Sequence, residues 1–234
     1  MTFHLDQKVG DIVAECPPAS NLFQRCGIDF CCGGNRPLRA ALEQKGITAD
    51  QFLAELEAAY ATAQKQADPS AVDWRKAPYG ELIDQIVGVH HQYLRTELPV
   101  ISAYVTKIFH VHGPHHPELA RLYQQFHQLK MELDMHIQDE EARVFPRVRA
   151  YEKTGSRAEL DEALACLDEL EQEHQGAGDL LAAMRETTRN YTLPADACGT
   201  YAMTFQKLQE LEANMFQHVH LENNVLFPRL RAEP

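Results

Sequence analysis

Two segments of the chain pair a histidine with a glutamate four residues later. These pairs are His136 with Glu140 and His218 with Glu222. In an α-helix, residues four apart lie one turn apart on the same face, so each pair would present an imidazole and a carboxylate together. Imidazole and carboxylate ligands in combination suit iron, and suit manganese or zinc less well. The spacing therefore predicts a metal site to which two helices each contribute one pair.

The pairs belong to an internal duplication. Segments 136–149 and 218–231, HIQDEEARVFPRVR and HVHLENNVLFPRLR, align at an offset of 82 residues, and two lone histidines, His91 and His174, align at an offset of 83. Each half thus supplies one lone histidine and, about 45 residues later, one His-x-x-x-Glu pair. We call these six residues the His4Glu2 set: His91, His136, Glu140, His174, His218 and Glu222. Four histidines and two bridging carboxylates would suit two metal ions. The spacing differs from the Glu-x-x-His of ferritin-like bundles and from the His-Glu-x-x-His of zinc peptidases.

Four long helices are expected to position this set. Apolar residues recur at spacings of three and four over about 79–112, 117–152, 157–190 and 199–231. Such helices, joined by short loops, predict an up-down-up-down four-helix bundle. Each places one histidine of the set on its apolar stripe, and the second and fourth add the glutamates. The first stripe is expected to comprise Ile83, Val87, His91, Leu94, Leu98, Ile101, Val105 and Ile108. Six ionisable groups in an apolar core cost free energy unless something satisfies them, which bound cations would do.

The N-terminal part of the sequence predicts short helices and tight turns rather than the long helices of the bundle. We therefore expect an all-α protein with a small helical domain over 1–65, a small, polar, proline-bearing linker over 66–77 and the bundle over 78–234. Within the first domain, the adjacent Cys31 and Cys32 precede two glycines. We interpret them as an exposed thiol pair in a flexible loop that could bind iron, dock on a client protein or take part in redox chemistry. A tight turn with incidental thiols is the alternative, and the other four cysteines are expected to be ordinary thiols.

Composition excludes several classes of function. With 22 basic and 34 acidic residues the net charge is −12, which argues against a nucleic-acid or anionic-membrane surface. No apolar run approaches the roughly 18 residues of a spanning helix. The first ten residues show neither the charged start nor the apolar core of a signal peptide. We expect a cytoplasmic protein with no nucleic-acid or membrane partner.

The chain closely resembles the repair-of-iron-centres (RIC) family, which are hemerythrin-like di-iron proteins of bacteria. The resemblance rests on Asp29-Phe30-Cys31-Cys32-Gly33-Gly34, Asp73-Trp74-Arg75, Glu173-His174, and the segment from His218 through Glu222-Asn223-Asn224 to Phe227-Pro228. It implies that the His4Glu2 set binds two non-haem iron ions in an oxo-bridged pair. It also implies a homodimeric cytoplasmic protein that restores iron–sulfur clusters damaged by nitric oxide or peroxide, with damaged or apo iron–sulfur proteins as partners.

Three functions stay open. We favour donation of labile iron to damaged clusters, without obligatory turnover. The alternatives are a di-iron nitric oxide reductase that forms nitrous oxide, which would make the chain an enzyme, and an oxygen-binding or oxygen-sensing hemerythrin. The candidate reactive residues are Cys31, Cys32, Glu132 and Glu173. Similar glutamates in the family imply that Glu132 and Glu173 line an iron or proton path, whereas the alternative is that both are solvated carboxylates.

Other histidines are assigned no metal. Residues 110–116 contain four of them. We expect a solvated loop there rather than a second metal patch, with His112 the member that comes nearest to the metal site without being a ligand. His90 and His220 adjoin stripe positions and are expected to face sideways as non-ligands.

Overall fold

The computed structural model describes residues 3–65 and 72–234, and over these residues the secondary structure is helical, with no β-strand. The all-α prediction is confirmed. Part of the expected 66–77 linker lies outside the described residues. The chain forms two compact units, one comprising Met1–Leu82 with Phe216–Pro234 and the other Ile83–Met215. The predicted domain limits at 65 and 78 remain a prediction.

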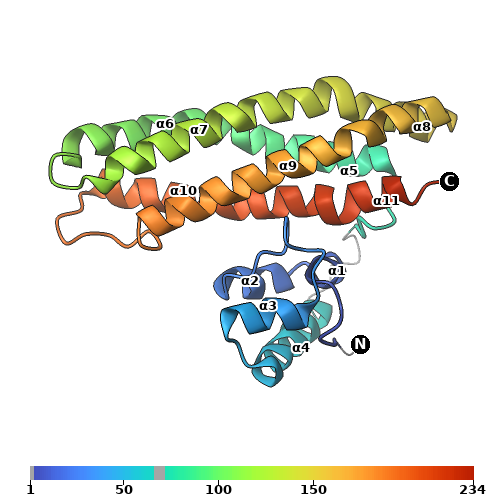
Figure 1. Ribbon diagram of the computed structural model, residues 1–234, viewed down its shortest axis with the longest axis horizontal. Helices are drawn as coiled ribbons and strands as arrows, with labels where there is room; N and C mark the ends of the chain where they lie inside the picture. The colour runs from blue at the N-terminus through green and yellow to red at the C-terminus, as the bar shows by residue number, and fades with distance from the viewer. Residues whose placement is uncertain (1–2, 66–71) are drawn as a thin grey trace. The chain divides into compact units, whose positions relative to one another are not determined.

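Long helical rods make up the predicted bundle (Figure 1). Their elements are α5 (Tyr79–Gln85), η1 (Ile86–His91) and α6 (Gln92–His112); α7 (Glu118–Asp139), η2 (Glu140–Val144) and α8 (Phe145–Thr154); α9 (Arg157–Thr187); and α10 (Gly199–Leu221), η3 (Glu222–Leu226) and α11 (Phe227–Arg231). Helix α7 packs against both α6 and α9. The rods begin and end within a few residues of the predicted segments, and the up-down-up-down order is confirmed.

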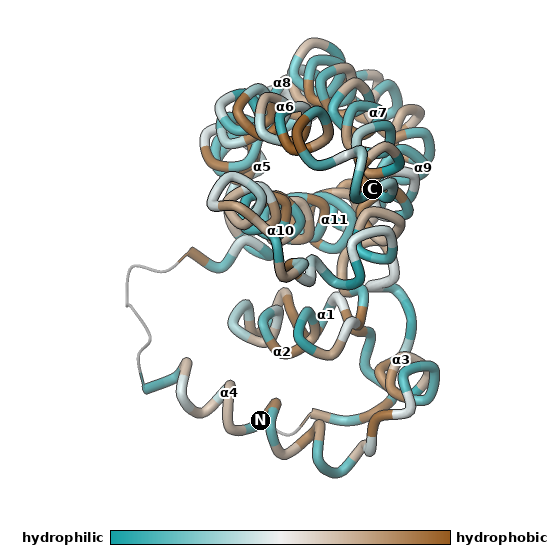
Figure 2. The backbone as a smooth tube through the Cα atoms, turned by 90° about the vertical axis from the view of Figure 1, so that its left-hand side faces the viewer, coloured by the Kyte–Doolittle hydropathy of each residue, from teal (hydrophilic) through white to brown (hydrophobic). Residues whose placement is uncertain are grey.

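Hydrophobic and hydrophilic residues are interspersed in the helices of the bundle (Figure 2), as expected for amphipathic helices. On α9 the buried residues recur at spacings of three and four from Leu160 to Met184, with His174 among them, as expected for an apolar stripe that carries one histidine. The first rod departs from prediction at one place, because Ile86 is buried while Val87 is only half-buried. These residues lie in η1, whose π-helical turn is wider than an α-turn and so shifts the register of the stripe.

Three π-helical segments begin or end at a residue of the His4Glu2 set. His91 is the last residue of η1, Glu140 is the first of η2, and Glu222 is the first of η3. Segments η2 and η3 each end just before a Phe-Pro pair, whose prolines, Pro146 and Pro228, have no N–H to donate to the carbonyl four residues back. π-Turns occur frequently at functional sites, and here each one sets the position of a candidate ligand.

The N-terminal helices form a small apolar core of their own. They are α1 (Val9–Glu15), α2 (Ala19–Arg25), α3 (Leu38–Lys45) and α4 (Ala49–Lys65). Gly27 and Gly46 end α2 and α3 in the left-handed conformation that favours glycine, with φ of 63° and 66°. The rings of Phe23 and Phe52 pack edge to face, and Phe216, from the same compact unit, packs against this core.

Candidate metal centre

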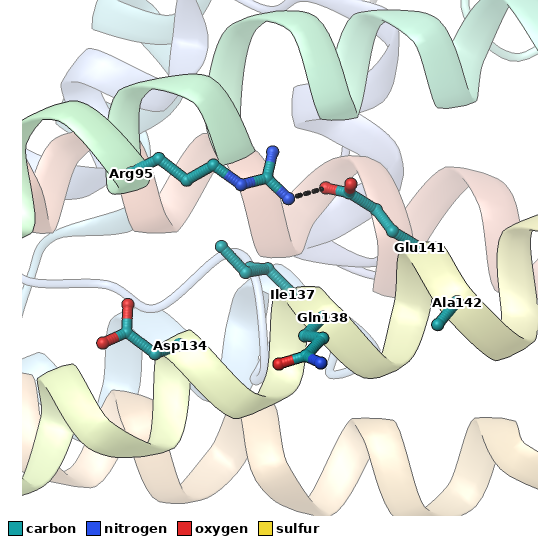
Figure 3. Close-up of a pocket in the computed structure, with 6 residues that line it drawn as sticks. All are labelled: Arg95, Asp134, Ile137, Gln138, Glu141 and Ala142. Atoms are coloured by element: carbon teal, nitrogen blue, oxygen red, sulfur yellow. Dashed lines mark hydrogen bonds and ion pairs between the residues drawn. The ribbon is translucent and has the colours of Figure 1, made fainter.

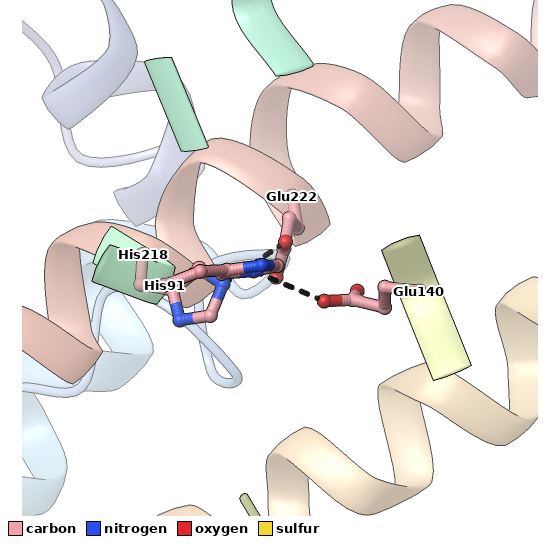
Figure 4. Close-up of side chains that lie close together, drawn as sticks. All are labelled: His91, Glu140, His218 and Glu222. Atoms are coloured by element: carbon pink, nitrogen blue, oxygen red, sulfur yellow. Dashed lines mark hydrogen bonds and ion pairs between the residues drawn. The ribbon is translucent and has the colours of Figure 1, made fainter. Parts of the chain in front are cut away.

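The structure buries all six residues of the His4Glu2 set. Two groups of these residues place one ligand atom each within 4.8 Å of one another. One group is His91, Glu140, His218 and Glu222, and the other is His136, Glu140, His174 and Glu222. Figure 4 shows the first group, with His91 paired to Glu140 and His218 paired to Glu222. Each group holds two histidines, and both glutamates belong to both groups.

The imidazoles converge through their Nε2 atoms. Nε2 of His136 lies 2.9 Å from Nε2 of His174 and 3.4 Å from Oε2 of Glu140. The same Glu140 oxygen lies 3.3 Å from Nε2 of His91, and Nε2 of His218 lies 3.1 Å from Oε1 of Glu222. Converging imidazole nitrogens and carboxylate oxygens are a donor set that suits iron. The residues present therefore fit metal, and their assignment as ligands remains our proposal.

Carboxylates outside the set orient two of these rings. Oε2 of Glu173 lies 2.6 Å from Nδ1 of His136, and Oε1 of Glu141 lies 2.6 Å from Nδ1 of His91. Such carboxylate–histidine pairs fix the ring orientation and the tautomer of a ligand histidine, leaving Nε2 for the metal. The bond with His136 lowers the pKa of Glu173 below its ordinary 4.5. Burial raises the pKa of Glu141, but its bonds with His91 and Arg95 lower it overall.

Glu141 also lies at a pocket of about 440 Å³ whose lining is shown in Figure 3. There Nη2 of Arg95 donates to the Glu141 oxygen that His91 contacts, at 2.6 Å. Arg95 thus holds Glu141 in place beside His91.

A larger cavity of about 530 Å³ adjoins the other side of the centre. Its lining includes Glu132, Glu173, His136 and His174. The structure therefore brings both predicted path glutamates to one opening that reaches two candidate ligands. Glu173 contacts His136 directly, whereas Glu132 accepts a hydrogen bond from Gln128 at 3.0 Å.

The thiol pair differs from expectation. Cys31 is buried, with 3% of its surface exposed, and Cys32 is half-buried, so the expected exposed pair is wrong. Asp29 folds the loop back by accepting the backbone N–H groups of Cys31 and Gly33 at 2.9 and 2.8 Å. The pKa of Cys31 is raised well above its ordinary 9.0. The causes are the hydrogen bond between Cys31 and Cys32, burial of the Cys31 thiol and the nearby carboxylate of Asp29. Within the described residues, neither cysteine forms a disulfide.

The cysteine loop is attached to η3 through a residue that sequence reasoning did not assign. Asn224 donates from Nδ2 to the carbonyl oxygens of Cys31, at 2.9 Å, and Phe30, at 3.3 Å. A Cβ atom on Gly10 or Gly34 would lie 2.2 or 2.3 Å from Oδ1 of Asn224, so a larger residue at either position would displace the Asn224 side chain. In the sequence, this role of Asn224 is indicated only by its place in the Asn223-Asn224 pair that follows Glu222.

His90 and His220 are buried rather than sideways-facing, with 6% and 3% of their surface exposed. The ring of His220 lies 5.8 Å from that of Phe30, and burial lowers its pKa to about 4. His112 also differs from expectation, because it contacts Cys198 rather than approaching the His4Glu2 set. Cys198 in turn is not the ordinary thiol that was expected. That His90 and His220 bind no metal remains a prediction.

None of the described helices has the length and apolar character needed to cross a membrane.

Comparisons with known proteins show the family of the chain. Residues 82–230 match the hemerythrin HHE cation-binding domain, and residues 5–60 match a domain of unknown function named ScdA_N. The chain is 36% identical to the iron-sulfur cluster repair protein YtfE of Enterobacter sp. (strain 638) and to that of Citrobacter koseri, and 35% identical to that of Escherichia coli O1:K1 / APEC. Each alignment covers 97% of both chains. The chain therefore belongs to the family of hemerythrin-like iron–sulfur cluster repair proteins, the family that its sequence motifs indicate.

Proposed function

We propose that this chain repairs iron–sulfur clusters damaged by nitrosative or oxidative stress, and that it does so by donating iron held in the His4Glu2 set. The observation that carries the proposal is the sharing of Glu140 and Glu222 by two groups of ligand atoms, each with two histidines of its own. This arrangement suits two iron ions with the two carboxylates common to both. When bound, iron would be the cargo that a damaged cluster needs.

The surrounding residues support release of iron as well as retention. Two histidines per ion are few, so each ion would be held by a small number of protein nitrogens. The cavity lined by Glu132 and Glu173 reaches His136 and His174, and carboxylates are suitable transient ligands for an iron ion that leaves by this route. Partial exposure of Glu173, at 47% of its side chain, keeps this route in contact with solvent.

The proposal is tested by iron transfer. The full chain, loaded with ferrous iron without oxygen, is mixed with an apo iron–sulfur protein and a sulfide source, and cluster formation is followed by its visible absorption. We expect transfer from the parent chain and loss of transfer in Glu140→Gln. Cluster formation at equal rates from Glu140→Gln and the parent would contradict the proposal.

The same preparations separate the alternatives. Nitrous oxide formed over repeated turnovers from nitric oxide, and retained in Cys31→Ala and Cys32→Ala, would favour the reductase. A stable, reversible oxygen adduct would favour an oxygen carrier or sensor. The cytoplasmic location and the homodimer also remain proposals, and size-exclusion chromatography with light scattering tests the latter.

A further inference from the structure

A second group of metal-ligating side chains lies in the loops of the unit Ile83–Met215. Two of its members flank the end of α6 and two lie in the loop before α10. We call them the loop cluster: His112, His116, Asp196 and Cys198. One ligand atom each of His112, His116 and Asp196 lie within 4.8 Å of one another. The fourth member joins them through Sγ of Cys198, which lies 3.2 Å from Nε2 of His112.

The loop cluster is separate from the His4Glu2 set. His112 follows His91 by 21 residues along the same rod. At about 1.5 Å per residue, this places it roughly 30 Å away along the helix axis. The two sites therefore share no residue and cannot share an ion.

We propose that the loop cluster binds one divalent transition-metal ion, with zinc as its best-suited occupant. Two imidazoles, one carboxylate and one thiolate are the ligand types that zinc takes in four-coordinate protein sites. The absence of a thiolate from the His4Glu2 set distinguishes the two sites chemically. A bound ion would join the loop between α6 and α7 to the loop between α9 and α10, at the end of the bundle where these helices turn.

Residues around the loop cluster favour metal binding by its members. The buried ring of Tyr201 lies 5.2 Å from that of His112 and 5.8 Å from that of His116, so it supports both imidazoles from the core side. Backbone hydrogen bonding from Tyr201 and the contact with His112 lower the pKa of Cys198 to about 7. A thiolate is the form that binds metal, so this environment lowers the cost of deprotonation.

Hydrogen bonding without metal is the competing explanation. Nε2 of His116 lies 3.1 Å from both oxygens of Asp196, which makes an ion pair when the ring is protonated. The His112–Cys198 contact can likewise be a simple hydrogen bond. In this explanation, His116 with Asp196 and His112 with Cys198 are two independent pairs, and no metal ion is bound. The experiment below measures whether Cys198 and Asp196 bind the same metal ion.

The test uses the full chain, freed of metal with a chelator and titrated with cobalt(II) as a spectroscopic probe for zinc. Cobalt bound by the loop cluster gains a thiolate-to-cobalt charge-transfer absorption. We expect the amplitude of this absorption at saturation to correspond to one thiolate-bound cobalt per chain, because the His4Glu2 set has no thiolate. The absorption should disappear on addition of excess zinc and be lost in Cys198→Ser. Asp196→Asn should weaken cobalt binding at least tenfold. Cys198 and Asp196 are exposed, so both variants should fold as the parent does.

Matched controls come from the same loop and from another helix. His115→Asn changes a neighbouring histidine outside the loop cluster, and Cys166→Ser removes a thiol of α9; both should retain the absorption. In a second measurement, zinc should slow alkylation of Cys198 at least tenfold while leaving that of Cys166 unchanged. An absorption that persists in Cys198→Ser, or alkylation of Cys198 that ignores zinc, would overturn the proposal and leave the two hydrogen-bonded pairs as the explanation.

Discussion

Oε2 of Glu173 lies 2.6 Å from Nδ1 of His136, on the side of the ring opposite the nitrogen that faces the metal centre. One helix, α9, thus supplies both a candidate ligand, His174, and the carboxylate that orients the ligand of its neighbour α7. The relation of Glu141 to His91 repeats this arrangement on the other side of the centre, at the same 2.6 Å. Carboxylates on the helices of the bundle therefore fix the orientation of the His136 and His91 rings.

Glu173→Gln should weaken iron binding without removing a ligand. The amide oxygen accepts a weaker hydrogen bond from Nδ1 of His136 than the charged carboxylate does, so the ring is held less firmly and loses some basicity. Losses of about 10–100-fold in metal affinity are typical of such changes. The measurement is competition for iron with a chelator of known affinity. Glu169→Gln is the matched control, because Glu169 lies one turn earlier on α9 and lines the same cavity. Equal affinities in the two variants would contradict the orienting role.

The contact between Gly10 and Asn224 should be visible as coupling between mutations. Gly10→Ala places a methyl group against the Asn224 side chain and should destabilise the fold by about 1–3 kcal/mol. Asn224→Ala removes Oδ1 and Cγ, the two closest atoms, and leaves only Cβ at 3.1 Å, so the double variant should recover more than about 0.5 kcal/mol relative to additivity. Urea unfolding measures all four corners of the cycle.

Gly176→Ala is the control for that cycle. A Cβ at Gly176 would meet nothing within 4 Å, and alanine is favoured over glycine in a helix by up to about 1 kcal/mol. We therefore expect Gly176→Ala to be neutral or stabilising. Strict additivity of Gly10→Ala and Asn224→Ala would show that the two side chains do not meet.

His127 should make the fold less stable in acid. Burial, followed by the charge of Lys130, lowers the pKa of His127 below its ordinary 6.5, and Nε2 lies 3.4 Å from the hydroxyl of Thr106. The unfolded chain therefore binds this proton more tightly than the folded chain. The contribution is fully present above about pH 6.5 and is lost as the pH falls through the lower folded-state value.

The measurement is urea unfolding of the parent and His127→Gln between pH 7.5 and 5, in steps of about half a unit. The variant should lose less free energy of unfolding over this range than the parent. An identical pH dependence in both proteins would rule out a half-buried His127 that stays neutral in the folded state.

The apolar stripes could be predicted because burial repeats with the helical period, and the His4Glu2 set could be found because ionisable residues interrupt those stripes. The π-helical segments could not be predicted, because one additional residue in a turn leaves the spacing of apolar residues almost unchanged. At η1 the sequence therefore predicts Val87 as the buried residue, whereas the structure buries its neighbour Ile86. The loop that holds the buried Cys31 is hydrogen-bonded to Asn224, which lies 193 residues away in the chain, so no local motif encodes its position. The loop cluster likewise joins His116 to Asp196 across 80 residues, a pairing that no local motif encodes.

The most direct test of the central claim is the iron content and visible spectrum of the chain purified without oxygen, beside Glu140→Ala and Glu222→Ala. Because both groups of ligand atoms include both glutamates, we predict two irons per parent chain and loss of both irons in either variant. Circular dichroism of the same samples checks that the helices remain. Iron content that is unchanged by both substitutions, or a parent chain that binds no iron, would contradict the His4Glu2 set as an iron site.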